Sequence, residues 1–474
     1  MKTKSYTLCT YAKAMRTWMF ALLAILGFCT VCESANAENS YVEYEFGTNV
    51  GYGDVAISDD GKYGVVVDFL GGVVSYLETD SGWAWHYNTS LVANVLAMSD
   101  DGQAIVMGGM YDEDTSRSSL YFFNQYGMEW ERNVTHDEDE GMGSGDYNGI
   151  RDVDISDDGK YIVAGSSNNK LYLFSDDGTL LWDFIGTTDG STGYGTSMNS
   201  VSISSNGDYI AAADKEYLYL FHKDNNTPIW SWVAPGYPQY SWDWPSHVRD
   251  VDISANGERI IAGVWSYAED YDSDDRGYVF MFGNEDNTPI WSYEEEGLNP
   301  ISAVAISADA EYSVVWHVDD EKRMIVFDNH YGTPLWQFGP LSASRFSPTV
   351  FSMSDDGKYI LAADAYSPAN QVLLFDIDDN SGPIWSYNSS AYGKEYCACH
   401  SVALSADGKY VLFAAGPSDD DSVYVFDSPR EINNADSSDG TSSDDEMEII
   451  EIPGPSLLAA TFAAFAVASL KRRT

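Results

Sequence analysis

Hydrophobic and polar positions repeat along this chain in one nine-residue pattern. Each copy has an apolar residue, any residue, a second apolar residue and then Ser, and it runs into a short polar turn such as residues 59–61. Eight copies begin at Val55, Leu96, Val153, Val201, Val251, Val304, Phe351 and Val402. Alternation with a period of two is typical of a β-strand, and Asp, Asn and Gly favour tight turns. We therefore predict eight strand-and-turn units, of which only the sixth lacks the turn Gly, at Ala310.

Three further apolar segments follow the nine-residue pattern within a unit. In the third unit they are residues 161–165, 171–174 and 180–184, separated by polar turns. The last segment carries a Trp in seven of the units: Trp85, Trp130, Trp182, Trp230, Trp291, Trp336 and Trp385. We expect these side chains to pack between neighbouring sheets, where large apolar groups are the usual filler. Each unit is thus predicted to form a sheet of four short strands.

The eighth unit stops after its third strand, at residues 423–426. Near the N-terminus, YEFG from Tyr44 matches WQFG from Trp336 in the spacing of its aromatic residues, so we expect it to supply the missing strand. A ring closed in this way leaves only short, protected edges. Units of about 40 to 60 residues suit four-stranded blades. The sequence predicts an all-β fold, an eight-bladed β-propeller of antiparallel strands over residues 38–428, with seven blades as the alternative.

These repeats resemble WD40-like and PQQ-like propeller repeats over about residues 41–428. The third strand departs from true WD40 repeats, because it ends in Phe, or in Tyr76 in the first unit, instead of the Trp-Asp pair. PQQ-like repeats are familiar from quinoprotein dehydrogenases and from the non-enzymatic outer-membrane assembly lipoprotein of bacteria. The resemblance therefore implies a fold more strongly than a function.

A quinoprotein-type dehydrogenase is the alternative function that this resemblance raises. Enzymes of that kind use a vicinal pair of cysteines and an acidic base beside the quinone, whereas Ala398 separates Cys397 and Cys399 here and no base can be matched. We find no phosphate loop, nucleophile elbow or zinc-protease motif. We therefore expect a protein that is not an enzyme, assign no catalytic residue, and do not expect PQQ as a cofactor.

Both ends of the chain carry the features of sorting segments. Residues 1–37 have basic residues, an apolar run and a small-residue cleavage site, as in a secretory signal peptide, with a membrane anchor as the alternative. Residues 429–451 form an acidic linker rich in Ser and Asp, and residues 452–474 form an apolar segment with a basic tip. The last segment resembles the C-terminal sorting signals of archaeal surface proteins, although it has PGPS where the best-known version has PGF. We expect an extracellular domain anchored at the cell surface.

The charge balance limits the class of partner. The chain has 25 Lys and Arg against 74 Asp and Glu, which gives a formal net charge of −49. A surface this acidic repels polyphosphate, so a nucleic-acid partner is excluded. We expect a surface-anchored module that binds a protein, a glycan or a cation.

The long loops between strands provide candidate binding residues. In a four-stranded meander, the loops between the second and third strands share a face with the loops between blades, and binding sites favour variable loops. One such loop carries four aromatic residues, Tyr237, Tyr240, Trp242 and Trp244, which could stack sugar rings or a partner's apolar side chains. Packing of the same loop onto the ring is the structural alternative.

Two further groups are candidates for metal or sulfur chemistry. Asp270, Asp272 and Asp274 alternate before Gly277 and could surround calcium, although a solvated charge run explains them as well. Cys397 and Cys399 could form a disulfide outside the cell, and metal binding together with His400 is the alternative. Calcium is thus the one cofactor that the sequence leaves open.

Overall fold

The structure is a computed structural model of the 474-residue chain. It describes residues 41–45, 53–68, 72–89, 92–110, 118–134, 149–187, 197–235, 247–266, 276–294, 301–317, 323–339, 351–364, 371–388, 398–416 and 422–427. Contacts divide the chain into two compact units, Met1–Asn39 and Ser40–Thr474, and every described residue belongs to the second. Within the described ranges, no helix is long and apolar enough to cross a membrane.

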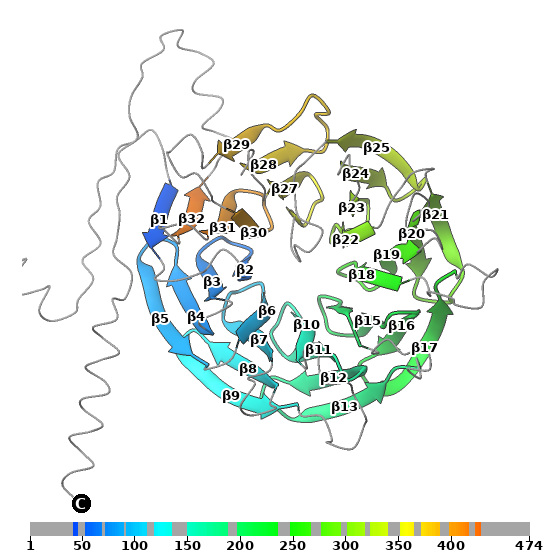
Figure 1. The fold of residues 1–474 in the computed structure, drawn as a ribbon, viewed down its shortest axis with the longest axis horizontal. Helices are drawn as coiled ribbons and strands as arrows, with labels where there is room; N and C mark the ends of the chain where they lie inside the picture. The colour runs from blue at the N-terminus through cyan, green and yellow to red at the C-terminus, as the bar shows by residue number, and fades with distance from the viewer. Residues whose placement is uncertain are drawn as a thin grey trace, which may run out of the picture. The chain divides into compact units, whose positions relative to one another are not determined.

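The described residues form eight antiparallel sheets of four strands each, arranged as blades around a common centre (Figure 1). In seven blades the four strands follow one another in sequence from the innermost to the outermost position. This is the arrangement of an eight-bladed β-propeller, so the predicted fold is confirmed and the seven-bladed alternative is set aside. The first strand of each blade is the one that the nine-residue pattern predicts.

The strands of the first four blades run from β2 to β17. Blade 1 has β2 (Val55–Ile57), β3 (Tyr63–Asp68), β4 (Val73–Glu78) and β5 (Gly82–Asn88). Blade 2 has β6 (Val92–Met98), β7 (Ala104–Met110), β8 (Ser119–Asn124) and β9 (Gly127–Asn133). Blade 3 has β10 (Ile150–Ile155), β11 (Tyr161–Ser166), β12 (Lys170–Ser175) and β13 (Leu180–Ile185). Blade 4 has β14 (Ser200–Ile203), β15 (Tyr209–Ala213), β16 (Tyr217–His222) and β17 (Asn225–Val233).

The remaining four blades contain β18 to β32 together with β1. Blade 5 has β18 (His247–Ile253), β19 (Arg259–Ser266), β20 (Arg276–Gly283) and β21 (Pro289–Glu294). Blade 6 has β22 (Ile301–Ile306), β23 (Tyr312–His317), β24 (Arg323–Asp328) and β25 (Thr333–Phe338). Blade 7 has β26 (Phe351–Met353), β27 (Tyr359–Asp364), β28 (Gln371–Asp376) and β29 (Trp385–Asn388). Blade 8 has β30 (Ala398–Leu404), β31 (Tyr410–Gly416), β32 (Ser422–Asp427) and, as its outer strand, β1 (Tyr41–Glu45).

The chain closes the ring on itself in blade 8. Strand β1 pairs antiparallel with β32 over five residues, from Tyr41 opposite Phe426 to Glu45 opposite Ser422. The first strand of the domain is therefore the fourth strand of its last blade, as the aromatic spacing around Tyr44 predicts. Because this pairing joins the two ends of the propeller, opening the ring requires breaking it.

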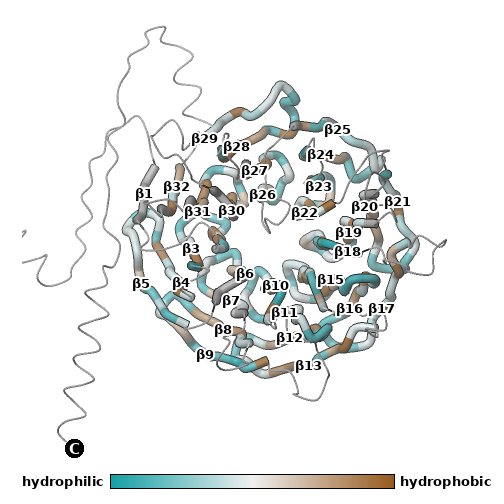
Figure 2. Tube along the Cα trace, viewed as in Figure 1, coloured by the Kyte–Doolittle hydropathy of each residue, from teal (hydrophilic) through white to brown (hydrophobic). Residues whose placement is uncertain are grey.

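The hydrophobic core lies between adjacent blades. Second and third strands such as β11 and β12 are buried at nearly every position, whereas fourth strands such as β13 alternate between exposed and half-buried positions. Each buried cluster joins two neighbouring blades; one of them packs Val106 and Phe122 of blade 2 against Ile162 of blade 3. Hydrophobic residues accordingly recur along every blade of the tube in Figure 2. Stability is therefore shared among eight similar interfaces.

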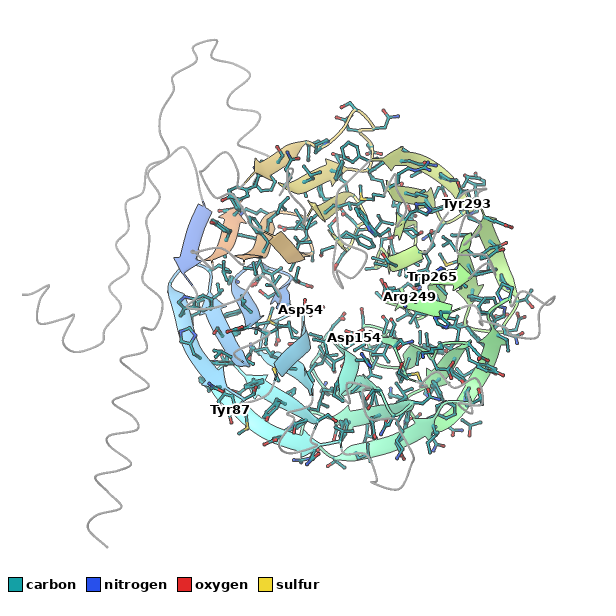
Figure 3. The ribbon with its side chains drawn as sticks, in the orientation of Figure 1. Asp54, Tyr87, Asp154, Arg249, Trp265 and Tyr293 are labelled. Atoms are coloured by element: carbon teal, nitrogen blue, oxygen red, sulfur yellow. The ribbon has the colours of Figure 1, made fainter. Side chains whose placement is uncertain are left out.

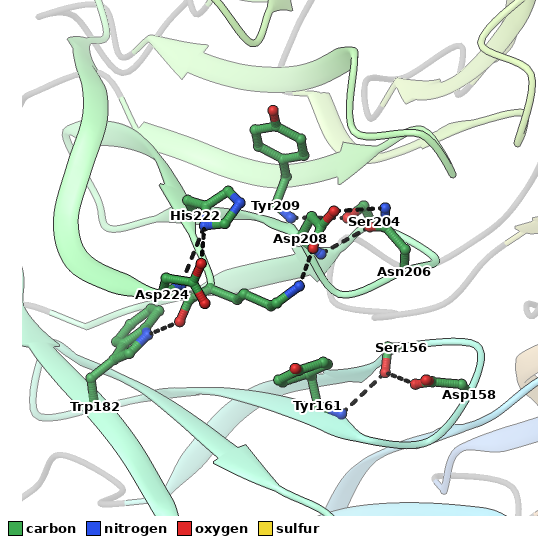
Figure 4. Close-up of polar contacts among 11 residues, drawn as sticks. Ser156, Asp158, Tyr161, Trp182, Ser204, Asn206, Asp208, Tyr209, His222 and Asp224 are labelled. Atoms are coloured by element: carbon green, nitrogen blue, oxygen red, sulfur yellow. Dashed lines mark hydrogen bonds and ion pairs between the residues drawn. The ribbon is translucent and has the colours of Figure 1, made fainter.

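The turn after each first strand is built by the Ser and Asp or Asn of the repeated pattern. In blade 4 the hydroxyl of Ser204 donates to Asn206, 3.1 Å away, and accepts the backbone N–H of Tyr209 at 3.0 Å (Figure 4). Gly207 completes the turn with a φ of +74°, and a Cβ there would lie 2.4 Å from the ring of Tyr161 in blade 3. Glycine is required at this position both for its backbone conformation and for the close approach of the tyrosine.

The sixth blade shows how the pattern tolerates its one departure. Ala310 takes the glycine position with a φ of +63°, which is strained for a residue with a side chain. In most blades, the turn glycine packs against a tyrosine of the preceding blade. Blade 5, which precedes blade 6, has Arg259 at the position of that tyrosine. The departure from Gly and the departure from Tyr thus occur at neighbouring positions of adjacent blades.

The tryptophans of the fourth strands link each blade to the next. The indole N–H of Trp182 in β13 donates to the backbone carbonyl of Lys223 in blade 4, at 2.6 Å (Figure 4). The same bond joins four other tryptophans to the following blade: Trp85, Trp130, Trp291 and Trp336. Trp230 is buried, but its indole nitrogen has no hydrogen-bond partner. The predicted packing between blades is confirmed, and a hydrogen bond adds to it in most blades.

This difference gives a matched pair of substitutions. Trp182→Phe and Trp230→Phe both replace an indole with a smaller phenyl ring. Only Trp182→Phe leaves a backbone carbonyl, that of Lys223, without its donor. Because a net hydrogen bond contributes about 1 kcal/mol, we expect Trp182→Phe to cost about 1 kcal/mol more than Trp230→Phe. Urea unfolding of the two variants measures the difference. Equal losses would show that the indole hydrogen bond contributes nothing.

Candidate functional site

The site residues predicted from sequence lie almost entirely outside the described residues. This holds for the aromatic loop residues Tyr237, Tyr240, Trp242 and Trp244, for Asp270, Asp272 and Asp274, and for Cys397. Cys399 lies in β30, where it is paired with Ala415 of β31. The aromatic site, the calcium site and the disulfide therefore stay predictions. The described residues point instead to polar groups around the centre of the propeller.

Carboxylates on the innermost strands join neighbouring blades. Asp154 of β10 accepts the backbone N–H of Ile155 in its own strand and that of Ile203 in blade 4, both at 2.8 Å. Asp54, directly before β2, makes the equivalent bonds to Val55 and to Leu96 of blade 2, at 2.9 and 3.1 Å. Figure 3 shows Asp54 and Asp154 at the inner edge of the ring. These side chains hold the inner strands together, so we assign them a structural role.

Blade 5 has two such carboxylates, Asp250 and Asp252, and both join it to blades 4 and 6. Asp252 of β18 accepts the N–H of Ile306 in blade 6 at 2.9 Å and the hydroxyl of Ser202 in blade 4 at 2.9 Å. Asp250 binds Val304 and Ser200 in the same way, at 2.8 Å each. Burial raises the pKa of both carboxyls to about 6, although the N–H and hydroxyl donors act in the opposite direction. At neutral pH both groups are thus ionised acceptors that span three blades.

The residues that follow the strand-ending Ser form a ring of backbone hydrogen bonds, which we call the turn ring. It consists of Asp59, Asp100, Asp157, Ser205, Ala255, Ala308, Asp355 and Ala406. The N–H of one member donates to the carbonyl of the next blade's member, as from Asp59 to Asp100 at 3.0 Å and from Asp355 to Ala406 at 3.1 Å. Four more such bonds join Asp157 to Ser205, Ser205 to Ala255, Ala255 to Ala308 and Ala308 to Asp355. Six of the eight steps around the axis are thus single backbone hydrogen bonds between neighbouring blades.

Four members of the turn ring are acidic, and we call Asp59, Asp100, Asp157 and Asp355 the axial carboxylates. Burial, followed by the charges of Asp157 and Asp59, raises the pKa of Asp100 to about 8. Burial and then the charge of Asp355 raise the pKa of Asp59 to about 6. The pKa of Asp355 is raised by burial and by Asp157. These groups come from blades 1, 2, 3 and 7, and their places in the hydrogen-bonded turn ring put them around the axis, near enough to influence one another's pKa values.

The axial carboxylates can attract positive charge without forming a tight metal site. The pKa of Asp100, raised to about 8 by burial and by the charges of Asp157 and Asp59, means that this carboxyl holds its proton at neutral pH in the free protein. Among the residues that the structure describes, no group of three or more His, Cys, Asp or Glu is placed to hold a metal ion. An ammonium or guanidinium group needs no such coordination geometry, because it is held by charge and by hydrogen bonds that it donates.

The raised pKa of Asp100 predicts a pH-dependent stability. Its folded pKa of about 8 lies above the value of an unfolded Asp, near 4, so folding takes up a proton. The stabilising contribution is complete below about pH 4 and is lost as the pH rises through 8. Asp100→Asn resembles the protonated acid at every pH. After allowance for solvent screening, we expect the variant to be about 1 kcal/mol more stable than the wild type at pH 9 and equal to it at pH 4. Denaturant unfolding at both pH values tests this expectation.

The sequence does not reveal the axial carboxylates, because the two adjacent Asp residues of a turn such as residues 59–60 have the same side chain and differ only in their structural roles. The second Asp builds the turn, as Asp60 does by accepting the hydroxyl of Ser58 at 3.0 Å. The first Asp instead enters the turn ring. The alternation of Asp with apolar residues in residues 152–155 was a visible sign of the inner-strand carboxylates, since a strand surrounded by sheets should not carry charge without a partner.

Comparison with known proteins supports the repeat. The family model described as WD domain, G-beta repeat matches residues 142–181, which include β10, β11 and β12 and the start of β13 in blade 3. No curated protein matches the chain. The match over one blade and the eight four-stranded blades together support a WD40-like β-propeller.

Proposed function

We propose that this protein is a surface-anchored binding module whose axial carboxylates hold positively charged side chains of a partner protein. The observation that carries the proposal is the convergence of Asp59, Asp100, Asp157 and Asp355 on the axis, from four different blades. Such a cluster of like charges costs stability in the free protein, and a cationic group would relieve the repulsion.

The frame around the cluster suits a binding role. The turn ring is fixed by backbone hydrogen bonds, and each turn is fixed by its Ser and Asp, so the carboxylates are positioned before a partner arrives. Pre-organised groups lose little entropy on binding. The net charge of −49 would also speed the encounter with a basic partner. WD40-like propellers use the same kind of rigid ring as an interaction platform.

We infer the location of the module from the two sorting segments that the sequence predicts. The secretory signal over residues 1–37 and the sorting segment over residues 452–474 support export and anchoring at the cell surface. An extracellular propeller attached through the acidic linker of residues 429–451 would meet other surface proteins or secreted ones. Partners with exposed Lys or Arg segments are the class that this charge pattern favours.

A hexa-arginine peptide serves as the probe for this proposal. The experiment compares the wild-type domain with the double variant Asp100→Asn/Asp157→Asn and with the control Asp80→Asn/Asp286→Asn. The control makes the same Asp-to-Asn change at two exposed acids in the outer turns of the same face, after β4 and β20. Calorimetric titration in low and in physiological salt measures the affinity, because salt weakens attraction that depends on overall charge.

We expect the axial variant to bind the peptide about 10-fold more weakly than the wild type, the change that about 1.4 kcal/mol produces. The control is expected to change the affinity by less than about 2-fold. If both double variants weaken binding equally, the attraction belongs to the whole acidic surface and the axial site is wrong. No binding by the wild type at either salt concentration would also contradict the proposal.

A further inference from the structure

The same glycosylation sequon occurs at the end of the outermost strand in three blades. The sequon is Asn-x-Ser/Thr, with any residue except Pro in the middle, and it accepts an N-linked glycan in exported proteins. It begins at Asn88, Asn133 and Asn388, the last residues of β5, β9 and β29 in blades 1, 2 and 7. Each of these residues follows the tryptophan of its strand by three positions. A fourth sequon begins at Asn225, the first residue of β17.

The strand pairing shows that the three positions are equivalent. Asn88 lies opposite Val73, the first residue of β4, and Asn133 lies opposite Ser119, the first residue of β8. Asn388 likewise lies opposite the first residue of β28. In blades 1 and 2 the residue after the Asn is buried, and its N–H donates to the carbonyl of the residue before the third strand, at 2.9 and 2.8 Å. The strand end is thus held in the same way in both blades.

The fold does not select Asn at this position. Asn88 and Asn133 are exposed. The residues with the same register in blades 3 and 4 are Ile185 and Val233, which are 59% and 54% exposed. A position that accepts an exposed apolar side chain in two blades needs no carboxamide for packing. The sequons of blades 1 and 2 therefore call for an explanation in their chemistry.

The fourth sequon differs, because its Asn has a structural role. Oδ1 of Asn225 accepts the backbone N–H of Thr227 at 2.9 Å and so builds the turn between β16 and β17. In blade 5 the carboxylate of Asp286 makes the same bond to Thr288 at 2.8 Å. Asp and Asn are interchangeable in this turn, so the turn alone explains Asn225.

The three equivalent strand ends lie along one arc of the propeller. The pairing of β1 with β32 places blade 8 between blades 7 and 1, so blades 7, 8, 1 and 2 are consecutive in the ring (Figure 1). Fourth strands run away from the turn ring, because successive antiparallel strands reverse direction. The sequons therefore lie at the outer edge of the face opposite the axial carboxylates, where added groups leave the axial site uncovered.

From these observations we propose that Asn88 and Asn133 carry N-linked glycans. The donor is an oligosaccharide carried on a lipid phosphate, and an oligosaccharyltransferase of the cell performs the transfer. Nδ2 of the Asn gives up one proton and forms a bond to the anomeric carbon of the sugar. The bond from that carbon to the phosphate oxygen breaks, and the lipid phosphate leaves. The proposal rests on the export that the proposed function includes, but it does not depend on the binding of a cationic partner.

Peptide mapping of the full-length protein, purified from the cells that produce it, tests this proposal. The protein is digested, and tandem mass spectrometry locates any added oligosaccharide mass. The wild type is compared with the double variant Asn88→Gln/Asn133→Gln, whose positions are exposed and are accordingly expected to tolerate the change. The same spectra show whether the chain begins after residue 37, so that a failure of export is read separately. Thermal melting of each variant checks that it folds.

Two further variants serve as controls. Asn225→Asp removes the fourth sequon and keeps the turn, because a carboxylate can accept the N–H of Thr227 as it does in blade 5. Ser90→Ala/Thr135→Ala keeps both acceptor asparagines and removes only the hydroxyl residue of each sequon. Loss of the added mass in this variant would show that the modification follows the sequon and not the Asn alone.

We expect the wild-type peptides that contain Asn88 and Asn133 to carry the same oligosaccharide mass, and both double variants to lose it completely. Asn225→Asp should leave these masses unchanged. Unmodified peptides from a chain that lacks residues 1–37 would overturn the proposal while the exported binding module stands. Unmodified peptides from a chain that retains residues 1–37 would overturn both glycosylation and export. An added mass that persists in Ser90→Ala/Thr135→Ala would show a different modification and would also contradict the proposal.

Discussion

Deletion of residues 41–45 is expected to destabilise the whole propeller. These residues form β1, whose five pairs with β32 supply the outer strand of blade 8 and join the first unit of the chain to the last. Without β1, the edge of β32 is exposed, and only the packing and hydrogen bonds between blades 8 and 1 hold the two ends together. We expect a loss of about 5 kcal/mol, which lowers the melting temperature by about 10 °C or more. Scanning calorimetry of the deletion variant measures the loss.

A synthetic peptide of residues 38–48 provides the control for this deletion. If the loss comes from the missing strand, the peptide should bind blade 8 and raise the melting temperature in a concentration-dependent way. A scrambled peptide of the same composition should have no effect. A deletion variant that melts at the wild-type temperature would show that the ring does not depend on its N-terminal strand.

Asp252→Ala is expected to cost about 3 kcal/mol at pH 7. At that pH the carboxylate, with a pKa of about 6, is ionised and accepts the N–H of Ile306 and the hydroxyl of Ser202 from two neighbouring blades. Its removal leaves both donors unsatisfied in a half-buried position, which is more costly than the loss of an average hydrogen bond. Urea unfolding measures the difference.

Two controls separate this bridging role from simple loss of charge. Asp252 accepts three hydrogen bonds, from Ser202, from the N–H of Ile306 and from the N–H of Ile253. Ser202→Ala removes one of them and should cost about 1 kcal/mol. Asp80→Ala removes a carboxylate from an exposed turn, where the change should be within about 0.5 kcal/mol. If Asp252→Ala costs no more than Asp80→Ala, the inner-strand carboxylates do not hold the blades together.

The sequence predicts the fold well because the same local rule is repeated eight times. A strand with alternating apolar residues, a Ser, a polar turn and, in seven blades, a Trp in the fourth strand determine each blade, and all of these features are local. Even ring closure could be predicted, since the eighth unit lacks one strand and the N-terminus supplies one. Ala310 shows the limit of a local rule, because its positive φ depends on what the neighbouring blade packs against the turn.

The candidate sites could not be predicted in the same way, because they arise only when the blades come together. Asp59 and Asp355 are almost 300 residues apart in sequence and come together only in the turn ring, where Ala406 alone separates them, so nothing local distinguishes them from the turn-building Asp60. The aromatic loop around Trp242 and the acidic run around Asp272 lie outside the described residues, and both remain predictions from sequence.

The pKa of the Asp100 carboxyl tests the axial binding site most directly. Carbon-13 labelling of aspartate, with assignment by Asp100→Asn, allows the carboxyl signal to be followed by NMR from pH 3 to pH 10. Convergence of the axial carboxylates predicts a titration near pH 8, and addition of hexa-arginine should move it to lower pH because a bound cation favours the ionised form. An Asp100 that titrates near pH 4, with or without the peptide, would contradict both the convergence and the proposed function.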